Sequence, residues 1–129
     1  MRLLVDTHLL LWAMSQSRRL PKDARALLED PANELFHSAA SLWEIAIKMG
    51  LRRADFMVDL PLLRDALSRM GSVELPVTGV HAERLLLLPP IHKDPFDRML
   101  VAQSLSEPLV LLTNDDQLAG YGTLVRVVR

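Results

Sequence analysis

Short apolar runs that alternate with helical segments constrain the fold of this chain most strongly. Five runs have the length and composition of strands, at residues 3–5, 34–37, 73–77, 109–112 and 124–128. The run at residues 3–5 is apolar on both faces, which is typical of a strand in a parallel sheet covered by helices on both sides. We therefore expect an α/β fold with a mostly parallel central sheet.

Local signals define the expected helices between these runs. Helical spacing of apolar residues, with prolines and glycines at the ends, predicts helices at residues 8–14, 21–30, 39–49, 59–70, 78–88 and 114–119, and one that begins at residues 94–95. Residue types that accept hydrogen bonds from free backbone N–H groups stand at four of the starts: Ser38, Asp59, Thr78 and Asp94.

Composition limits the classes of protein that this chain can belong to. Its 129 residues, half of them apolar, suffice for one core, and we expect residues 1–129 to form a single domain. The absence of cysteine excludes disulfides and zinc–thiolate sites. A net charge of −1 argues against a highly basic nucleic-acid coat protein. It permits a nuclease, because a bound cation brings its own positive charge.

The chain shows no apolar stretch suited to a membrane. The longest apolar run, residues 85–91, contains two prolines and falls short of the roughly 20 residues that a spanning helix needs. The first apolar run meets Asp6 after three residues, which is too short for a signal peptide. We expect a cytoplasmic protein without a membrane partner.

Four acidic residues lie at positions where α/β folds commonly bind ligands. Ligands of an open parallel sheet bind at the carboxyl ends of the strands. The four acids follow a strand or lie in the first turns of a helix: Asp6, Glu44, Asp97 and Asp115. Asp6, Asp97 and Asp115 also have structural explanations as residues of a turn or of a helix start. Glu44 lies on a helix that is expected to be largely buried, where an unpaired carboxylate is costly, so we expect it to have a partner. The argument therefore rests on the set. Together they are expected to converge on one rim of the sheet.

A cluster of carboxylates is suited to binding a divalent cation. Without a cation they repel one another and resist ionising together. Mg²⁺ prefers oxygen ligands and commonly uses one or two carboxylates together with water and phosphate oxygens. Such an ion lowers the pKa of a coordinated water molecule, so that the water can attack a phosphodiester. The cluster therefore indicates metal-dependent phosphodiester hydrolysis.

Four segments, in order along the chain, resemble the motifs of PIN-domain proteins. They read VDT at residues 5–7, SLWEI at 41–45, HKDPFDRMLVAQ at 92–103 and LTND at 112–115. The third is long and specific, and the second has its acid on a helix. The motifs span residues 5–115, nearly the whole chain. The sequence is most similar to the VapC-type toxins of type II toxin–antitoxin systems.

The resemblance implies a PIN-like three-layer α/β/α sandwich and an endoribonuclease that depends on Mg²⁺ or Mn²⁺. It implies a catalytic acidic quartet, with the first and third as metal ligands: Asp6, Glu44, Asp97 and Asp115. It also implies RNA as substrate, a homodimer, and a cognate antitoxin with a segment near the active site.

Further roles follow from the same resemblance. Thr7 and Thr113 would orient ligands or water, and Asp94 would be structural. Asp116 stands beside Asp115, and spacing favours Asp115 as the fourth acid without excluding its neighbour.

Some residues in or near the motifs have open roles. Arg98 either pairs with a carboxylate or faces substrate, and His92 has the best functional case among four otherwise structural histidines. Contact with RNA phosphates or a solvated surface explains the basic residues Arg18, Arg19, Lys48, Arg52 and Arg53. For Trp12 and Trp43, packing in the core or in a dimer is favoured over stacking on a base.

Other classes of function fit less well. A PIN-fold subunit that binds partners without catalysis is the main alternative, although the four acids argue against it. A phosphatase of the phosphotransfer type would need a second aspartate at position 8, where this chain has His8. A nucleotide-binding Rossmann domain would need a glycine-rich loop after the first strand, and the sequence has none there.

Overall fold

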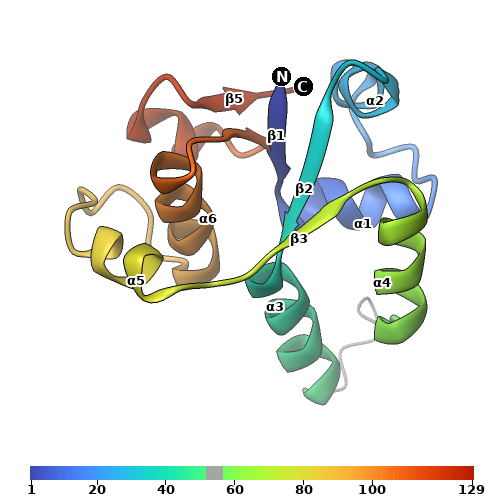
Figure 1. Cartoon of the computed structure of the whole chain (residues 1–129), viewed down its shortest axis with the longest axis horizontal. Coiled ribbons are helices and arrows are strands. Elements are labelled where there is room, and N and C mark those ends of the chain that lie inside the picture. Colours follow the sequence, from blue (N-terminus) through green and yellow to red (C-terminus); the bar gives the residue numbers. More distant parts are fainter. Residues whose placement is uncertain (52–56) are drawn as a thin grey trace.

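The computed structural model describes residues 1–51 and 57–129. Within this part of the chain, five strands form one sheet in the order β3-β2-β1-β4-β5, and every pair of neighbours is parallel. Figure 1 shows β1 and β2 near the centre, with helices to either side. The predicted α/β class with a parallel central sheet is confirmed.

The strands are short and the helices longer, as the sequence pattern predicts. The strands are β1 (Arg2–Val5), β2 (Glu34–Ser38), β3 (Val73–Leu75), β4 (Val110–Thr113) and β5 (Val125–Val127). The helices are α1 (Thr7–Met14), α2 (Lys22–Glu29), α3 (Ala39–Gly50), α4 (Leu60–Arg69), α5 (Gly79–Leu85), α6 (Pro95–Ser106) and the short 3₁₀ helix η2 (Asp116–Tyr121).

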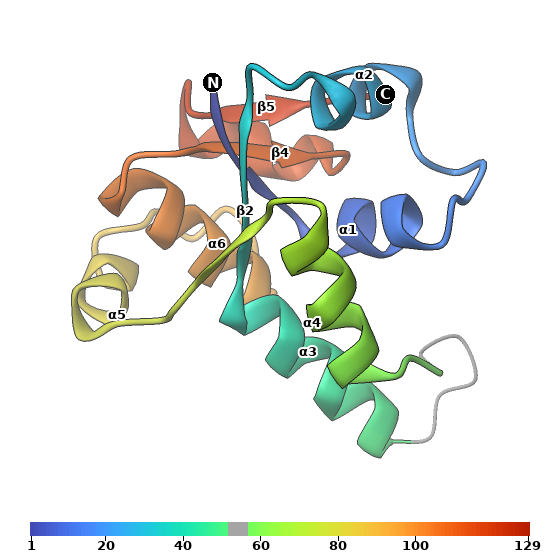
Figure 2. The same cartoon turned by 45° about the vertical axis from the view of Figure 1, so that its right-hand side comes forward.

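Successive side chains of the central strands point to opposite faces of the sheet and pack into two separate apolar cores. Val5 and Leu112 pack in a cluster with residues from α1, α2, α3 and α4. Leu4 and Leu111 point to the opposite face and pack in a second cluster with residues of α6 and η2. Figures 1 and 2 show the corresponding layers, with α1 and α4 on one side of the strands and α5 and α6 on the other. The sheet is thus the middle layer of an α/β/α sandwich.

The expected capping residues begin their helices. Ser38 accepts a hydrogen bond from the Ala40 N–H, and Asp59 accepts one from the Leu62 N–H. Asp94 accepts two, from Phe96 and Asp97. These bonds satisfy backbone donors that the first turn of a helix leaves free.

The structure corrects two expected helices in detail. The helix expected at residues 78–88 ends at Leu85, because the N–H groups of Leu86 and Leu87 bond three residues back and tighten the last turn. The segment expected at residues 114–119 is the 3₁₀ helix η2. The basic pair Arg52 and Arg53 lies outside the described residues. Among those described, no helix has the length and apolar character needed to cross a membrane.

Replacement of Asp94 tests its capping role. Asp94→Ala removes the acceptor of two backbone N–H groups, and we expect the free energy of unfolding to fall by about 1 kcal/mol. Asp94→Asn keeps a side-chain oxygen and should stay close to wild type. Urea unfolding at pH 5 is the measurement, because the nearby Asp97 carboxyl is protonated there. Equal loss in both variants would contradict the capping role.

Candidate functional site

Asp6 lies at the carboxyl end of β1 and is 4% exposed. Its Oδ1 accepts a hydrogen bond from the Leu9 N–H at 3.0 Å, which makes it the N-cap of α1. Its Oδ2 accepts one from the Thr113 hydroxyl at 2.5 Å. Burial raises the pKa of Asp6 above its usual value, while these two hydrogen bonds act to lower it. The carboxylate is held in place at both oxygens.

Asp97 lies in the first turn of α6, near enough to Asp6 to interact with it electrostatically. Its pKa is raised to about 7, mainly by burial and in addition by the negative charges of Asp94, Asp6 and Glu44, while His92 acts in the opposite direction. The acids on β1, α3 and α6 therefore lie near enough to interact electrostatically. The structure brings the first three predicted acids together.

Glu44 of α3 is a buried carboxylate with one oxygen paired. Its Oε2 lies 2.9 Å from the Lys48 ammonium, one helical turn along. The partner that a buried glutamate requires is therefore Lys48, at a spacing of four residues that the sequence displays. Among the described residues, Oε1 of Glu44 has no hydrogen-bond partner and is shielded from water.

Asp115 follows β4 and completes the group. Its Oδ2 lies 3.0 Å from His92 Nε2, and ligand atoms of His92, Asp97 and Asp115 all lie within 4.8 Å of one another. Asp116 instead is exposed and pairs with Arg129. The geometry thus favours Asp115 over its neighbour as the fourth acid. Sequence spacing of the histidines gave no sign of this cluster.

The remaining predicted residues have defined neighbours. The buried Thr7 hydroxyl donates to Ser41 Oγ at 2.8 Å, and Ser41, within the second motif, was not singled out by the sequence. Arg98 donates to the carbonyl oxygens of Leu85 and Pro89 and to the Tyr121 hydroxyl. Arg98 therefore ties the segment after α5 to η2.

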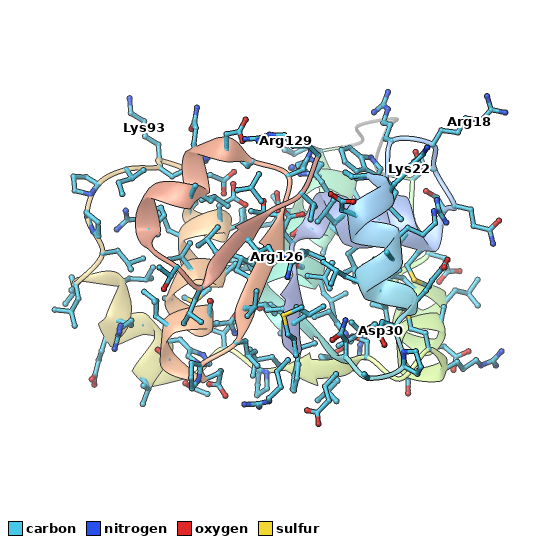
Figure 3. All side chains as sticks on the ribbon, turned by 90° about the horizontal axis from the view of Figure 1, so that it is seen from above. Arg18, Lys22, Asp30, Lys93, Arg126 and Arg129 are labelled. Carbon is cyan, nitrogen blue, oxygen red and sulfur yellow. The ribbon has the colours of Figure 1, made fainter. Side chains whose placement is uncertain are left out.

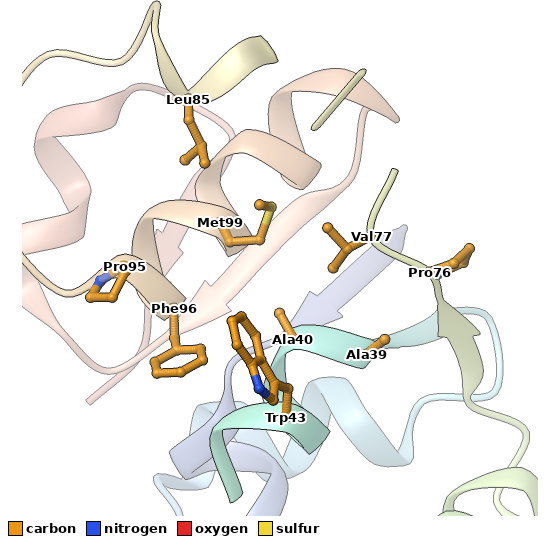
Figure 4. A pocket seen from close by; sticks show the side chains of 9 residues that line it. All are labelled: Ala39, Ala40, Trp43, Pro76, Val77, Leu85, Pro95, Phe96 and Met99. Atoms are coloured by element: carbon orange, nitrogen blue, oxygen red, sulfur yellow. The ribbon is translucent and has the colours of Figure 1, made fainter. Parts of the chain in front are cut away.

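The two tryptophans lie in different surroundings. Trp12 is partly buried against one apolar core. Trp43 is 63% exposed, so a place in the core is wrong for it, and packing in a dimer remains a prediction. It packs edge-on against Phe96, with ring centroids 5.3 Å apart. Both rings line an apolar pocket of about 660 Å³, which Figure 4 shows from close by: Ala39, Ala40, Trp43, Pro76, Val77, Leu85, Pro95, Phe96 and Met99.

The donor set of the acidic group fits a hard divalent cation. The pKa values of Asp6 and Asp97 are raised, mainly because burial disfavours their charged forms and in addition because neighbouring carboxylates repel them. The unpartnered Oε1 of Glu44 is a buried acceptor, among the described residues, that a cation or its water would satisfy. Carboxylate oxygens are the ligands that Mg²⁺ and Mn²⁺ prefer. The residues present therefore suit such an ion.

Fold and site define a parallel α/β domain with an acidic centre at the carboxyl ends of its strands. Residues 3–124 match the model of the PIN domain family, and the chain belongs to this family. PIN domains are in general nucleases that use divalent metal ions. No curated protein matches the sequence significantly.

Solved structures share the fold. VapBC2 from Rickettsia felis, bound to a DNA fragment from its promoter, is similar with a TM-score of 0.66 and 12% identity, over 94% of this chain and 93% of that chain. A toxin–antitoxin complex from Klebsiella pneumoniae is similar with a TM-score of 0.62 and 24% identity, over 96% and 98%. These likenesses confirm the predicted PIN-like fold.

The raised pKa of Asp97 has a consequence for stability. Between about pH 4 and pH 7 the folded chain keeps a proton that the unfolded chain, with a carboxyl pKa near 3.8, has lost. The free energy of unfolding of metal-free protein should therefore fall as pH rises through this window, and level off above it.

Asp97→Asn removes the ionisable group and tests this. In EDTA at pH 8 the variant should be more stable than wild type by about 1–2 kcal/mol, a discounted figure because the Asp97 side chain is 24% exposed. At about pH 3, below the carboxyl pKa of the unfolded chain, the two should agree closely. The exposed Asp116→Asn serves as control, and a gain that is equal at both pH values would refute the explanation.

Proposed function

We propose that this chain is a metal-dependent endoribonuclease, the toxin of a VapC-like toxin–antitoxin pair. The observation that carries the proposal is that Asp6, Glu44, Asp97 and Asp115, which are distant in sequence, lie in one acidic group. Among the described residues, one buried oxygen of this group, Glu44 Oε1, has no hydrogen-bond partner. Membership of the PIN domain family supports the nuclease class. In this proposal residues 1–129 form a single PIN-like domain that acts in the cytoplasm, where its RNA lies.

Asp6 and Asp97 would hold the metal ion, Mg²⁺ or Mn²⁺. Such an ion supplies positive charge to the scissile phosphate and lowers the pKa of a coordinated water molecule. Asp115 lies beside Asp97 and would complete the acidic group. The chain offers the carboxylates that this chemistry needs and requires no cysteine or serine nucleophile.

Neighbouring residues hold these carboxylates ready. The Thr113 hydroxyl and the Leu9 N–H keep the Asp6 carboxylate in one orientation. Lys48 binds one oxygen of Glu44 and leaves the other to orient water, or to accept its proton, at the phosphate. Thr7, anchored to Ser41, would steady the start of α1.

Contact with RNA would come from the rim of this site. Figure 3 shows Arg18, Lys22 and Lys93 projecting away from the ribbon. Of these, Lys93 follows His92 directly in the chain, so it would bind RNA phosphates beside the acidic group. Arg98 already donates to three oxygens of the protein, so it would support substrate through the loop that it holds. His92 lies at the edge of the acidic group and would lie near bound RNA.

A cognate antitoxin is part of the proposal. The similar structures come from a VapBC protein and from a toxin–antitoxin complex. An antitoxin would restrain the nuclease by covering its site. The competing possibility, a PIN-fold subunit that binds partners without catalysis, has the same fold but would not need a competent acidic group.

A cleavage assay separates the two possibilities. Purified, antitoxin-free chain is incubated with total cellular RNA and Mn²⁺ or Mg²⁺. Discrete cleavage should appear, vanish in EDTA, and fall at least about 100-fold in Asp6→Asn, because a direct ligand should cost more than the 10–100-fold typical of residues that only support one.

Asp116→Asn is the matched control, since Asp116 pairs with Arg129 outside the acidic group. It should cleave as wild type does. Cleavage that survives EDTA and Asp6→Asn would reject the carboxylate–metal mechanism. No cleavage of any RNA, with an intact fold, would favour the binding subunit.

The apolar pocket supports the proposed homodimer. Trp43 exposes most of a large aromatic ring, and the pocket beside it is walled by apolar side chains of α3, α5 and α6. Exposed aromatic residues of this kind dominate the energetics of protein interfaces. We place the second copy of the chain over this pocket.

Trp43→Glu tests the dimer by placing a charge in the interface. Wild type should elute with twice the 14.5 kDa mass of the chain, and the variant should shift to monomer at micromolar concentration, as measured by light scattering after gel filtration. Leu62→Glu, at a similarly exposed position on α4, should remain dimeric. A variant that stays dimeric would move the interface elsewhere, and a monomeric wild type would reject the dimer.

A further inference from the structure

His92 lies in the loop between α5 and α6 and is held from several sides. Its own N–H donates to the Tyr121 hydroxyl oxygen at 2.9 Å. Its Nδ1 accepts a hydrogen bond from the Asp94 N–H at 3.1 Å. Its Nε2 lies 3.0 Å from Asp115 Oδ2 and 3.7 Å from Asp97 Oδ2, and its side chain is only 14% exposed. The ring therefore has one defined orientation.

By distance alone, His92 looks like a metal ligand. Its Nε2 and one oxygen each of Asp97 and Asp115 lie within 4.8 Å of one another, a spacing that a shared cation allows. An imidazole ligand would favour transition metals over Mg²⁺. The hydrogen bond at the other ring nitrogen decides whether this is possible.

The proton on the ring is placed by the Asp94 backbone. A backbone N–H only donates, so Nδ1 must be the acceptor and carries no proton. The neutral imidazole then has its single proton on Nε2. A metal ion at Nε2 would require this proton to leave while Nδ1 is also bare, or the bond to Asp94 to break. Nε2–H instead matches the carboxylate oxygen of Asp115 that lies in front of it.

Hydrogen bonds hold both carboxylate oxygens and the backbone N–H of Asp115. Its Oδ1 accepts from the Gln117 N–H at 2.9 Å, and its N–H donates to Thr113 Oγ1 at 3.1 Å. The same Thr113 hydroxyl donates to Asp6. His92 supplies the remaining bond, at Oδ2. It thus closes a network that joins the loop before α6 to the ends of β4 and β1.

We propose that His92 is a positioning residue of the acidic site, whose Nε2–H holds the Asp115 carboxylate beside Asp97 without itself binding the metal. The proposal rests on the metal-dependent site of the proposed function. Without this donor, the Asp115 carboxylate would keep only the Gln117 N–H bond at Oδ1. Its Oδ2 could then turn away from the negatively charged Asp97, and the cation would lose a preorganised oxygen. Residues that orient ligands in this way typically change metal affinity by about 10–100-fold.

Two amide variants separate the two nitrogens of the ring. His92→Gln can place an N–H near the position of Nε2, whereas His92→Asn can only replace Nδ1 as the acceptor for Asp94. The dissociation constant of Mn²⁺ is measured by calorimetry on the full chain. We expect His92→Gln to bind within about threefold of wild type, and His92→Asn and His92→Ala to bind at least about tenfold more weakly. Thermal melting confirms that each variant is folded.

Pulsed electron paramagnetic resonance of bound Mn²⁺ provides a second readout. Wild type should show no coupling to an imidazole nitrogen. A nitrogen coupling that disappears in His92→Gln would make His92 a ligand and overturn the proposal. So would wild-type affinity in His92→Asn, or a folded His92→Gln as weak as His92→Ala. Wild type that binds no Mn²⁺ would instead reject the metal site of the proposed function, and the inference with it.

Discussion

The pairing of β1 with β4 is the constraint on which the site depends. Val5 is in register with Leu112, and the Asp6 N–H continues the ladder by donating to the Leu112 carbonyl at 3.0 Å. This places Asp6 beside Thr113, which is 107 residues away in sequence and donates to its carboxylate. Because both strands are parallel and central, the residues that follow them emerge at one buried edge. The other acids join this pair.

The acidic residues lie close together although their negative charges repel one another. Burial and neighbouring carboxylates raise the pKa values of Asp6 and Asp97, and Lys48 compensates only one oxygen of Glu44. Such a cluster costs free energy, and the divalent cation of the proposed function would offset that cost on binding. In the proposed nuclease, a chain with a net charge of −1 would therefore attract a phosphate through the bound ion.

The sequence predicts the elements and the acids better than it predicts their contacts. The spacing of apolar residues, the capping residues and the prolines determine structure over a few neighbouring residues. The strands, the helices and the cap at Asp94 can therefore be predicted from them. Glu44 required a partner, and Lys48 is visible four residues on. The approach of His92 to Asp115 depends on the path of the loop before α6, and the exposure of Trp43 depends on which face of α3 stays uncovered. Neither is encoded in local periodicity.

The exposed tryptophan and the buried acids are parts of one arrangement. Consecutive residues of a helix point about 100° apart, so α3 directs Glu44 into the site and Trp43 out of it. On α6, the consecutive residues Phe96 and Asp97 likewise point in different directions. The carboxylates of these two helices repel each other, and this repulsion adds to the larger effect of burial on the pKa of Asp97. The edge-on contact of Trp43 with Phe96 acts in the opposite sense and holds the helices together. The exposed ring of Trp43 therefore also contributes to the packing of α3 against α6 within the single chain.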